Sequence, residues 1–266
     1  MRCLIVLLLG IGSAMPATAQ DFQKGMEAAQ RGDYAAALRE WRPLAKKGDA
    51  DAQTNMGMMY ENGWGVPQDD GEAVKWYRIA AKQGRVEAQY NLGVMYDEGR
   101  GVPQDFTEAT KWYRKAAERG YAEAQFNLGN MYYGGRGVPQ NYAQAVVWYR
   151  NAAEQGRVLA QYNLGVIYRD GQGVPQDFDE AVKWYRLAAE QGLAVAQSDL
   201  GIMYGAGQGA PKDYVQAHLW FTLAATQGNE FAMKNRDIAE SIMTSSDISK
   251  AKRLAREWLE QHGKAK

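Results

Sequence analysis

A period of 36 residues runs through most of this 266-residue sequence. The heptapeptide GRGVPQD at residues 99–105 recurs with small changes at 63–69, 135–141, 171–177 and 207–213. Tryptophan returns at the same spacing, at Trp76, Trp112, Trp148, Trp184 and Trp220. Such a period is typical of a repeat protein, in which each unit buries its apolar face only by stacking on its neighbours.

Each unit reads as two helices joined by the heptapeptide. In residues 85–120, Ala88, Leu92 and Tyr96 are four apart and share one face of a first helix. The segment after the heptapeptide places Trp112 and Tyr113 with several alanines on the apolar face of a second helix. We therefore predict an all-α fold of 36-residue helix-turn-helix repeats, in which small residues let the helices approach closely.

The heptapeptide is explained as a helix stop, a turn and a helix start. Gly99 follows the first helix, where glycine adopts a left-handed conformation at little cost, and Gly101 extends the turn. Pro103 prevents helix continuation, and Asp105 with Glu108 three residues later forms a capping-box pattern. A phosphate-binding loop is disfavoured, because it needs Gly-Lys-Ser/Thr before its helix, or a preceding strand in the dinucleotide-binding variant.

The repeated pattern AxxxLGxMYxxGxGVPQDxxxAxxWYRxAAxxG resembles the Sel-one-like repeat (SLR) family, a relative of the tetratricopeptide repeats. The resemblance covers residues 49–228 as five repeats and implies an α/α solenoid, a right-handed superhelix. It also implies a scaffold for protein–protein interactions, of a kind frequent in bacterial envelope and signalling systems. The flanking residues 20–48 and 229–266 depart from the pattern, and we expect N- and C-terminal capping helices there.

Residues 1–19 have the features of a secretory signal peptide. Arg2 gives a basic start, residues 4–12 are apolar, and Ala17-Thr18-Ala19 is a small-residue cleavage site. The apolar run is too short to span a bilayer, so we expect an exported chain without an integral membrane segment after cleavage, and a retained anchor is the alternative. We expect a periplasmic protein, with secretion as the other destination. The only cysteine, Cys3, lies in this signal, so the mature chain is expected to have no disulfide.

The sequence offers little catalytic chemistry. The two histidines, His218 and His262, are too isolated to build a metal cluster, and we interpret His218 as a residue of the helix surface. The arginine and glutamate pairs spaced four apart, such as Arg114 and Glu118, are interpreted as solvated surface pairs. We therefore expect no enzyme, no metal and no cofactor. The balance of 31 basic and 31 acidic residues also argues against a nucleic-acid partner.

The best candidate for a binding site is one side of the first helices. Ala88 and Leu92 lie on a side whose residues hardly change between units, whereas the opposite side varies, with Leu159 and Val195 on it in later units. In tetratricopeptide-like solenoids the first helices line the concave groove, so the resemblance implies that the variable side faces a protein or peptide ligand. The predicted binding residues are Tyr90, Val94, Asp97, Phe126, Asn130, Tyr133, Tyr162, Val166 and Arg169.

Three functions remain open at this point. The first is a non-catalytic adaptor or regulator of the bacterial cell envelope that binds a protein in the concave groove. The second is a binder of cell-wall or exopolysaccharide glycan, because aromatic ladders also stack on sugars. The third is a β-lactam- or peptidoglycan-processing enzyme like some cysteine-rich relatives of the repeat family, although this chain lacks their cysteine pairs.

Overall fold

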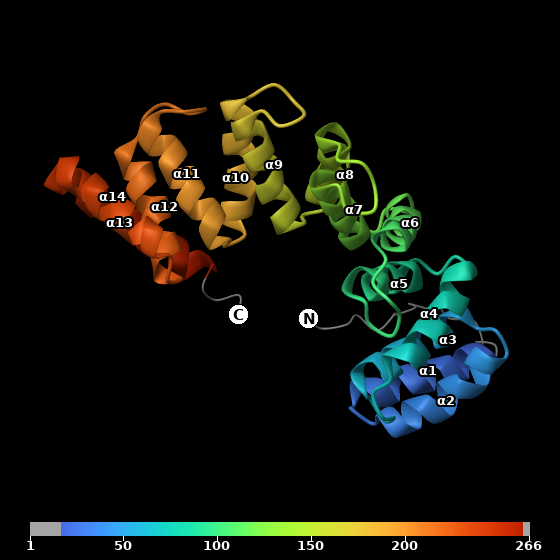
Figure 1. The fold of residues 1–266 in the computed structure, drawn as a ribbon. Helices are drawn as coiled ribbons and strands as arrows, with labels where there is room; N and C mark the ends of the chain where they lie inside the picture. Colours follow the sequence, from blue (N-terminus) through green and yellow to red (C-terminus); the bar gives the residue numbers. More distant parts are fainter. Residues whose placement is uncertain (1–16, 263–266) are drawn as a thin grey trace. The chain divides into compact units, whose positions relative to one another are not determined.

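The computed structural model describes residues 17–262, and every regular element within that range is an α-helix. The helices follow one another with short connections (Figure 1). In chain order they are α1 (Ala17–Gln30), α2 (Tyr34–Lys46), α3 (Ala50–Asn62), α4 (Asp70–Lys82), α5 (Val86–Glu98), α6 (Phe106–Ala117), α7 (Ala122–Gly134), α8 (Tyr142–Glu154), α9 (Val158–Asp170), α10 (Phe178–Glu190), α11 (Ala194–Ala206), α12 (Tyr214–Thr226), α13 (Glu230–Ile242) and α14 (Ser245–His262).

The helices divide into two compact units, a first unit with α1–α7 that ends at residue 140 and a second unit with α8–α14 that begins at residue 141. Within each unit a helix packs mainly on the helices next to it in sequence, as α4 does on α3 and α5. The predicted all-helical fold of repeated helix pairs is confirmed. Most of the predicted signal, residues 1–16, lies outside the described residues, and Ala17–Ala19 form the first turn of α1.

In several first helices a glycine makes room for an aromatic ring of the second helix. A Cβ on Gly93 would lie 2.7 Å from Cδ1 of Tyr113, and a Cβ on Gly165 would lie 2.4 Å from Cδ1 of Tyr185. Both rings are buried. The close approach predicted for this glycine is present, and the ring that needs it belongs to the tyrosine after the repeated tryptophan.

The heptapeptide forms the expected helix stop and turn. Gly99 ends α5 with φ 69°, in the left-handed region that favours glycine. Gly101 has φ 67°, and a Cβ on it would lie 2.2 Å from the carbonyl oxygen of Asp70 in the preceding repeat. This second glycine therefore does more than extend the turn, because it lets each loop rest against the second helix of the repeat before it.

The helix start after the heptapeptide has half of the predicted capping box. Asp105 Oδ1 accepts hydrogen bonds from the backbone N–H groups of Thr107 and Glu108, at 2.9 and 3.0 Å. In the other half of the box the N–H of Asp105 would donate to the Glu108 carboxylate, but that N–H donates to the carbonyl of Tyr96, 3.0 Å away. The Glu108 carboxylate instead lies near Lys111 and the indole N–H of Trp112.

A buried glutamine ties three helices together in the repeats. In the second unit, Gln161 of α9 donates from Nε2 to the carbonyl of Ala153 at the end of α8, 3.1 Å away. Its Oε1 accepts from Gln191 after α10, at 2.8 Å. Gln89 of α5 makes the first contact with Ala81, but its buried Oε1 has no hydrogen-bond partner within residues 17–262. In this repeat Arg119 occupies the position of Gln191, and it donates a hydrogen bond to the carbonyl of Gly84 instead.

The arginines of the second helices bind across repeats. Arg114 donates from Nη2 to the hydroxyl of Tyr132 in the next first helix, 2.7 Å away, and Arg78 does the same with Tyr96 at 3.0 Å. The interpretation of Arg114 and Glu118 as a solvated surface pair is therefore wrong. The arginine reaches a tyrosine that the stacking of repeats brings close.

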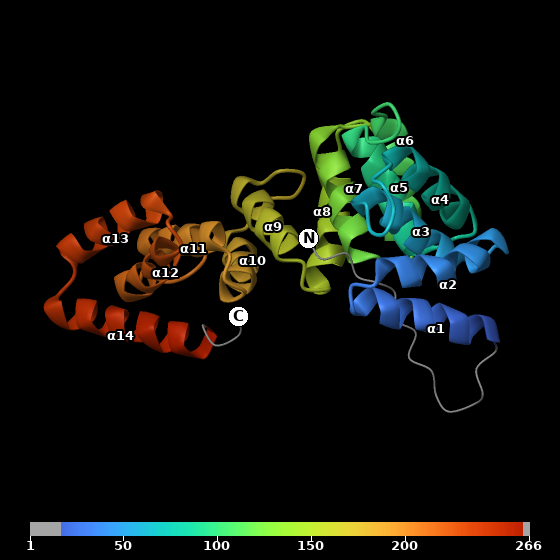
Figure 2. The same cartoon turned by 90° about the horizontal axis from the view of Figure 1, so that it is seen from below.

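The described segments that flank the repeats are also helical. In α2 the buried Trp41 donates its indole N–H to the carbonyl of Phe22 in α1, 3.2 Å away. At the other end, α12 packs against both α13 and α14 (Figure 2). His218 of α12 is fully buried there, with Nε2 2.8 Å from Glu240 of α13, so its interpretation as a surface residue is wrong.

Candidate partner-binding face

The first helix of each repeat turns one side to the core. In α5 this side carries Ala88, Leu92 and Met95, which are fully buried. We call the opposite side the first-helix face. All nine predicted binding residues lie there and all are half-buried: Tyr90, Val94, Asp97, Phe126, Asn130 and Tyr133 in the first unit, and Tyr162, Val166 and Arg169 in the second.

The aromatic residues of this face also pack within the fold. The ring centroid of Tyr90 lies 5.9 Å from that of Tyr113 and 5.1 Å from that of Tyr121. In the second unit the ring of Tyr162 lies 5.7 Å from that of Tyr185. These side chains consequently support the second helices, and replacing them by alanine would disturb packing as well as any binding.

Asp97 belongs to a polar network of the first unit. Its Oδ2 accepts a hydrogen bond from the hydroxyl of Tyr113 at 3.2 Å, and its Oδ1 lies 3.6 Å from Arg136 in the next loop. Burial, with Asp97 adding to it, raises the pKa of Tyr113 well above its usual range. One repeat earlier, Glu61 accepts from the buried Tyr77 at 2.5 Å. The acidic end of the first helix thus satisfies a buried tyrosine hydroxyl.

In the second unit an arginine takes the place of the aspartate in this network. Arg169 stands where Asp97 stands in the first unit, and it lies 2.7 Å from Asp170 and 3.8 Å from Asp199. Burial raises the pKa of Tyr162 to about 12, with neighbouring Asp199 adding to the effect. Burial also raises the pKa of Asp199, while Arg169 opposes that rise. The buried hydroxyl of Tyr185 has no hydrogen-bond partner within the described part of the chain.

An exposed apolar row crosses the first-helix face of the second unit. Leu159 of α9, Val195 of α11 and Phe231 of α13 occupy the same repeat position and are 45%, 43% and 58% exposed. In the first unit this position holds acidic residues. Two of them, Asp51 and Glu87, lie 2.7 and 3.0 Å from Arg85. The predicted binding residues omit this row, although the 36-residue register from Leu159 to Phe231 was readable in the sequence.

The described residues show no arrangement typical of metal chemistry. Within residues 17–262 no three His, Cys, Asp or Glu side chains are grouped so that they could hold a metal ion. Over the same range no helix combines the length and apolar character needed to cross a membrane. The first-helix face presents half-buried apolar, aromatic and charged side chains, a composition that suits the binding of another macromolecule.

Comparison with known proteins identifies the family of the repeats. A family model described as Sel1 repeat matches residues 50–84, 86–121, 122–156, 158–193 and 194–229, which together make up more than half of the chain. A solved Sel1 repeat protein from Oxalobacter formigenes is 34% identical, with a TM-score of 0.78 over 92% of this chain and 100% of that one.

A protective antigen from uropathogenic Escherichia coli strains, which displays an SLR fold, is 28% identical. The structural match covers 91% of this chain and 76% of the antigen chain, with a TM-score of 0.47. No curated protein matches the sequence.

Proposed function

This chain belongs to the Sel1 repeat family, and we propose that it is a non-catalytic, exported scaffold that binds a protein partner through its first-helix face. Proteins of this family generally serve as scaffolds for protein–protein interactions. The binding surface then lies on the first helices, and the protein acts in the bacterial cell envelope.

The observation that carries the proposal is the apolar row of the second unit. Leu159, Val195 and Phe231 are large side chains left in contact with water at one repeat position on alternate helices. Apolar side chains that are exposed at the same position of successive first helices are candidates for an interaction surface. The half-buried Tyr162 and Val166 lie on the same side of α9 as Leu159 and extend the surface.

The experiment uses the mature chain, from Gln20 onward, as bait in an extract of the cell envelope. The test variant replaces Leu159, Val195 and Phe231 by serine. The matched control replaces three apolar residues of second helices that are comparably exposed, Ile79, Val147 and Leu187. Circular dichroism verifies that both variants keep their helices.

We expect a partner protein that the wild type and the control variant capture and that the test variant loses. Capture that is equal for all three chains would place the binding surface elsewhere. Binding of purified peptidoglycan or exopolysaccharide in the absence of protein, lost in the test variant, would support the glycan alternative instead.

Export is tested separately. We propose cleavage after Ala19 on the pattern of residues 1–19. Fractionation of cells that produce the full chain, followed by N-terminal sequencing, is expected to find a periplasmic protein that begins at Gln20. A chain that stays in the cytoplasm with its first residues intact would refute export without touching the binding proposal.

A further inference from the structure

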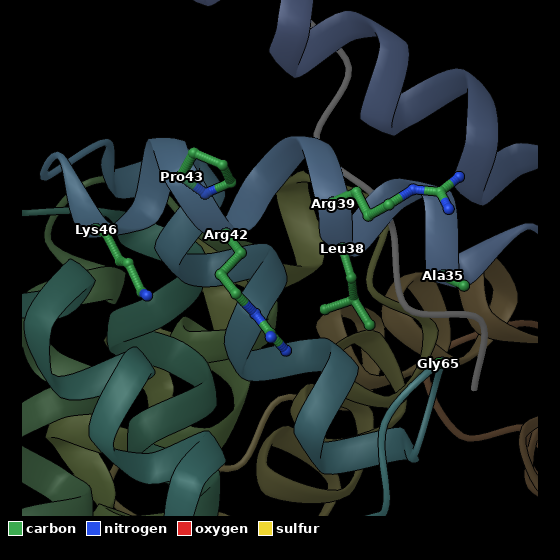
Figure 3. Close-up of a pocket in the computed structure, with 7 residues that line it drawn as sticks. All are labelled: Ala35, Leu38, Arg39, Arg42, Pro43, Lys46 and Gly65. Carbon is green, nitrogen blue, oxygen red and sulfur yellow. The ribbon is translucent and has the colours of Figure 1, made fainter.

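A basic hollow of about 490 Å³ lies beside α2 in the first unit. Arg39, Arg42 and Lys46 line it, spaced three and four residues apart along one face of the helix. Figure 3 shows Leu38, Arg42 and Lys46 projecting from the same side of α2, while Arg39 extends in another direction. The loop that carries Gly65 lies at the Leu38 end of this side. The lining contains no carboxylate, so the hollow combines positive charge with an apolar floor.

The charge of this hollow is unpaired because α2 departs from the repeats. Lysines 36, 72 and 144 residues after Arg39 each lie within 2.9 Å of a glutamate three residues before them. In α2 that position is Ala36, so Arg39 has no such neighbour. Arg42 is in register with Arg78, which donates to a tyrosine hydroxyl. Within residues 17–262, Arg39, Arg42 and Lys46 have neither an ion pair nor a side-chain hydrogen bond.

The loop that carries Gly65 packs closely on α2 and borders the hollow. Gly65 has φ 71°, and a Cβ there would lie 2.9 Å from Cδ1 of Leu38 and 2.9 Å from the carbonyl carbon of Tyr34. A larger residue in the loop would therefore collide with α2. The exposed ring of Pro43 also lines the hollow.

We propose that this hollow binds an acidic peptide segment of a partner protein, at a site separate from the first-helix face. An anionic partner follows from charge complementarity. The three cations span about 10 Å along the helix, a length that an extended chain covers in about three residues. Two or three carboxylates with an apolar side chain between them can therefore meet the cations and the floor together.

The number of cations in the hollow suits a short peptide better than an anionic membrane. A cluster that holds an anionic membrane has about four to eight Lys or Arg residues, whereas three line this hollow. The whole chain carries no net formal charge, so no long-range field attracts a membrane or a polyanion to it. A short acidic peptide can bind through the local charge of Arg39, Arg42 and Lys46 alone.

The test measures fluorescence anisotropy of a fluorescein-labelled peptide made of three Glu-Leu-Glu-Gly units. A second peptide carries glutamine in place of every glutamate. The test variant of the mature chain is Arg39→Gln/Arg42→Gln/Lys46→Gln. The matched control is Lys75→Gln/Lys111→Gln/Lys183→Gln, which removes the same total charge from paired positions.

We expect the acidic peptide to bind the wild type and the control, and to bind the test variant at least about tenfold more weakly. The glutamine peptide should lose affinity by a similar factor, and raising the salt should weaken binding. The variant Ala36→Glu supplies the carboxylate that the repeats have, so it should weaken peptide binding while the helix stays intact.

Either of two results would overturn the proposal. One is an equal loss of affinity in the test and control variants, which would show a general charge effect. The other is binding of phosphatidylglycerol vesicles by the wild type in the absence of any peptide binding, which would assign the hollow to a membrane surface. Neither result bears on the apolar row, whose test uses other residues.

Discussion

Replacing Gly165 by alanine should destabilise the second unit, although alanine is the better helix former. The new Cβ would lie 2.4, 2.6 and 2.9 Å from three ring atoms of Tyr185, a ring with no exposed surface. Overpacking of a dense core costs up to about 3 kcal/mol, while removing a glycine from a helix contributes about 1 kcal/mol in the other direction. The expected net loss is about 2 kcal/mol of unfolding free energy.

The matched control is Gly205→Ala, in α11 of the same unit. A Cβ there would have its nearest neighbour, the Cβ of Ala217, at 3.7 Å, which is an ordinary contact. This variant should gain about 0.5–1 kcal/mol from helix propensity alone. The two alanine variants should thus differ by about 3 kcal/mol, or by roughly 6–12 °C in melting temperature.

Urea unfolding followed by circular dichroism measures both variants. A double-mutant cycle with Tyr185→Leu adds a test of the cause, because a smaller side chain should make Gly165→Ala less harmful. If Gly165→Ala proved as stable as the wild type, the explanation of this glycine by the tyrosine ring would be refuted.

Two further predictions concern polar contacts. Arg119→Gln should donate a hydrogen bond to the unpartnered Oε1 of Gln89 and raise the unfolding free energy by about 1 kcal/mol; urea unfolding measures the gain, and an unchanged midpoint contradicts it. Hydrogen bonds from His218 and Lys252 lower the pKa of Glu240 to about 2 from its usual 4.5. Its contribution to stability is therefore present above pH 4.5 and lost as the pH falls toward 2. Acid unfolding should show this loss, and Glu240→Gln should remove it.

The local features of the fold were predictable from the sequence. Helix periodicity, the left-handed Gly99 and the capping by Asp105 depend on a few consecutive residues, and all three are present. The function of Gly101 was not predictable in the same way. Its contact is the carbonyl of Asp70, about 30 residues away in the chain, and only the stacking of repeats brings the two together.

The candidate site was predicted less completely for the same reason. The helical period shows which side of α5 faces away from Leu92, but it cannot show that Tyr90 leans on Tyr121 of the next repeat. Likewise His218 is buried because α13 covers it with Glu240, a residue that departs from the repeat pattern. The repeat pattern did not predict the unpaired cations of α2, because they depend on a departure from it: Ala36 stands where several other repeats have a glutamate.

The packing of each helix on its sequence neighbours determines how the protein should respond to mechanical load. Within a unit, a pull on the end detaches the outermost helix pair from the pair behind it, since few contacts reach further along the chain. Each detached repeat of 36 residues releases about 120–130 Å of extended chain. Stretched by its ends, a unit should lengthen in steps of that size, so that under tension it acts as an extensible tether.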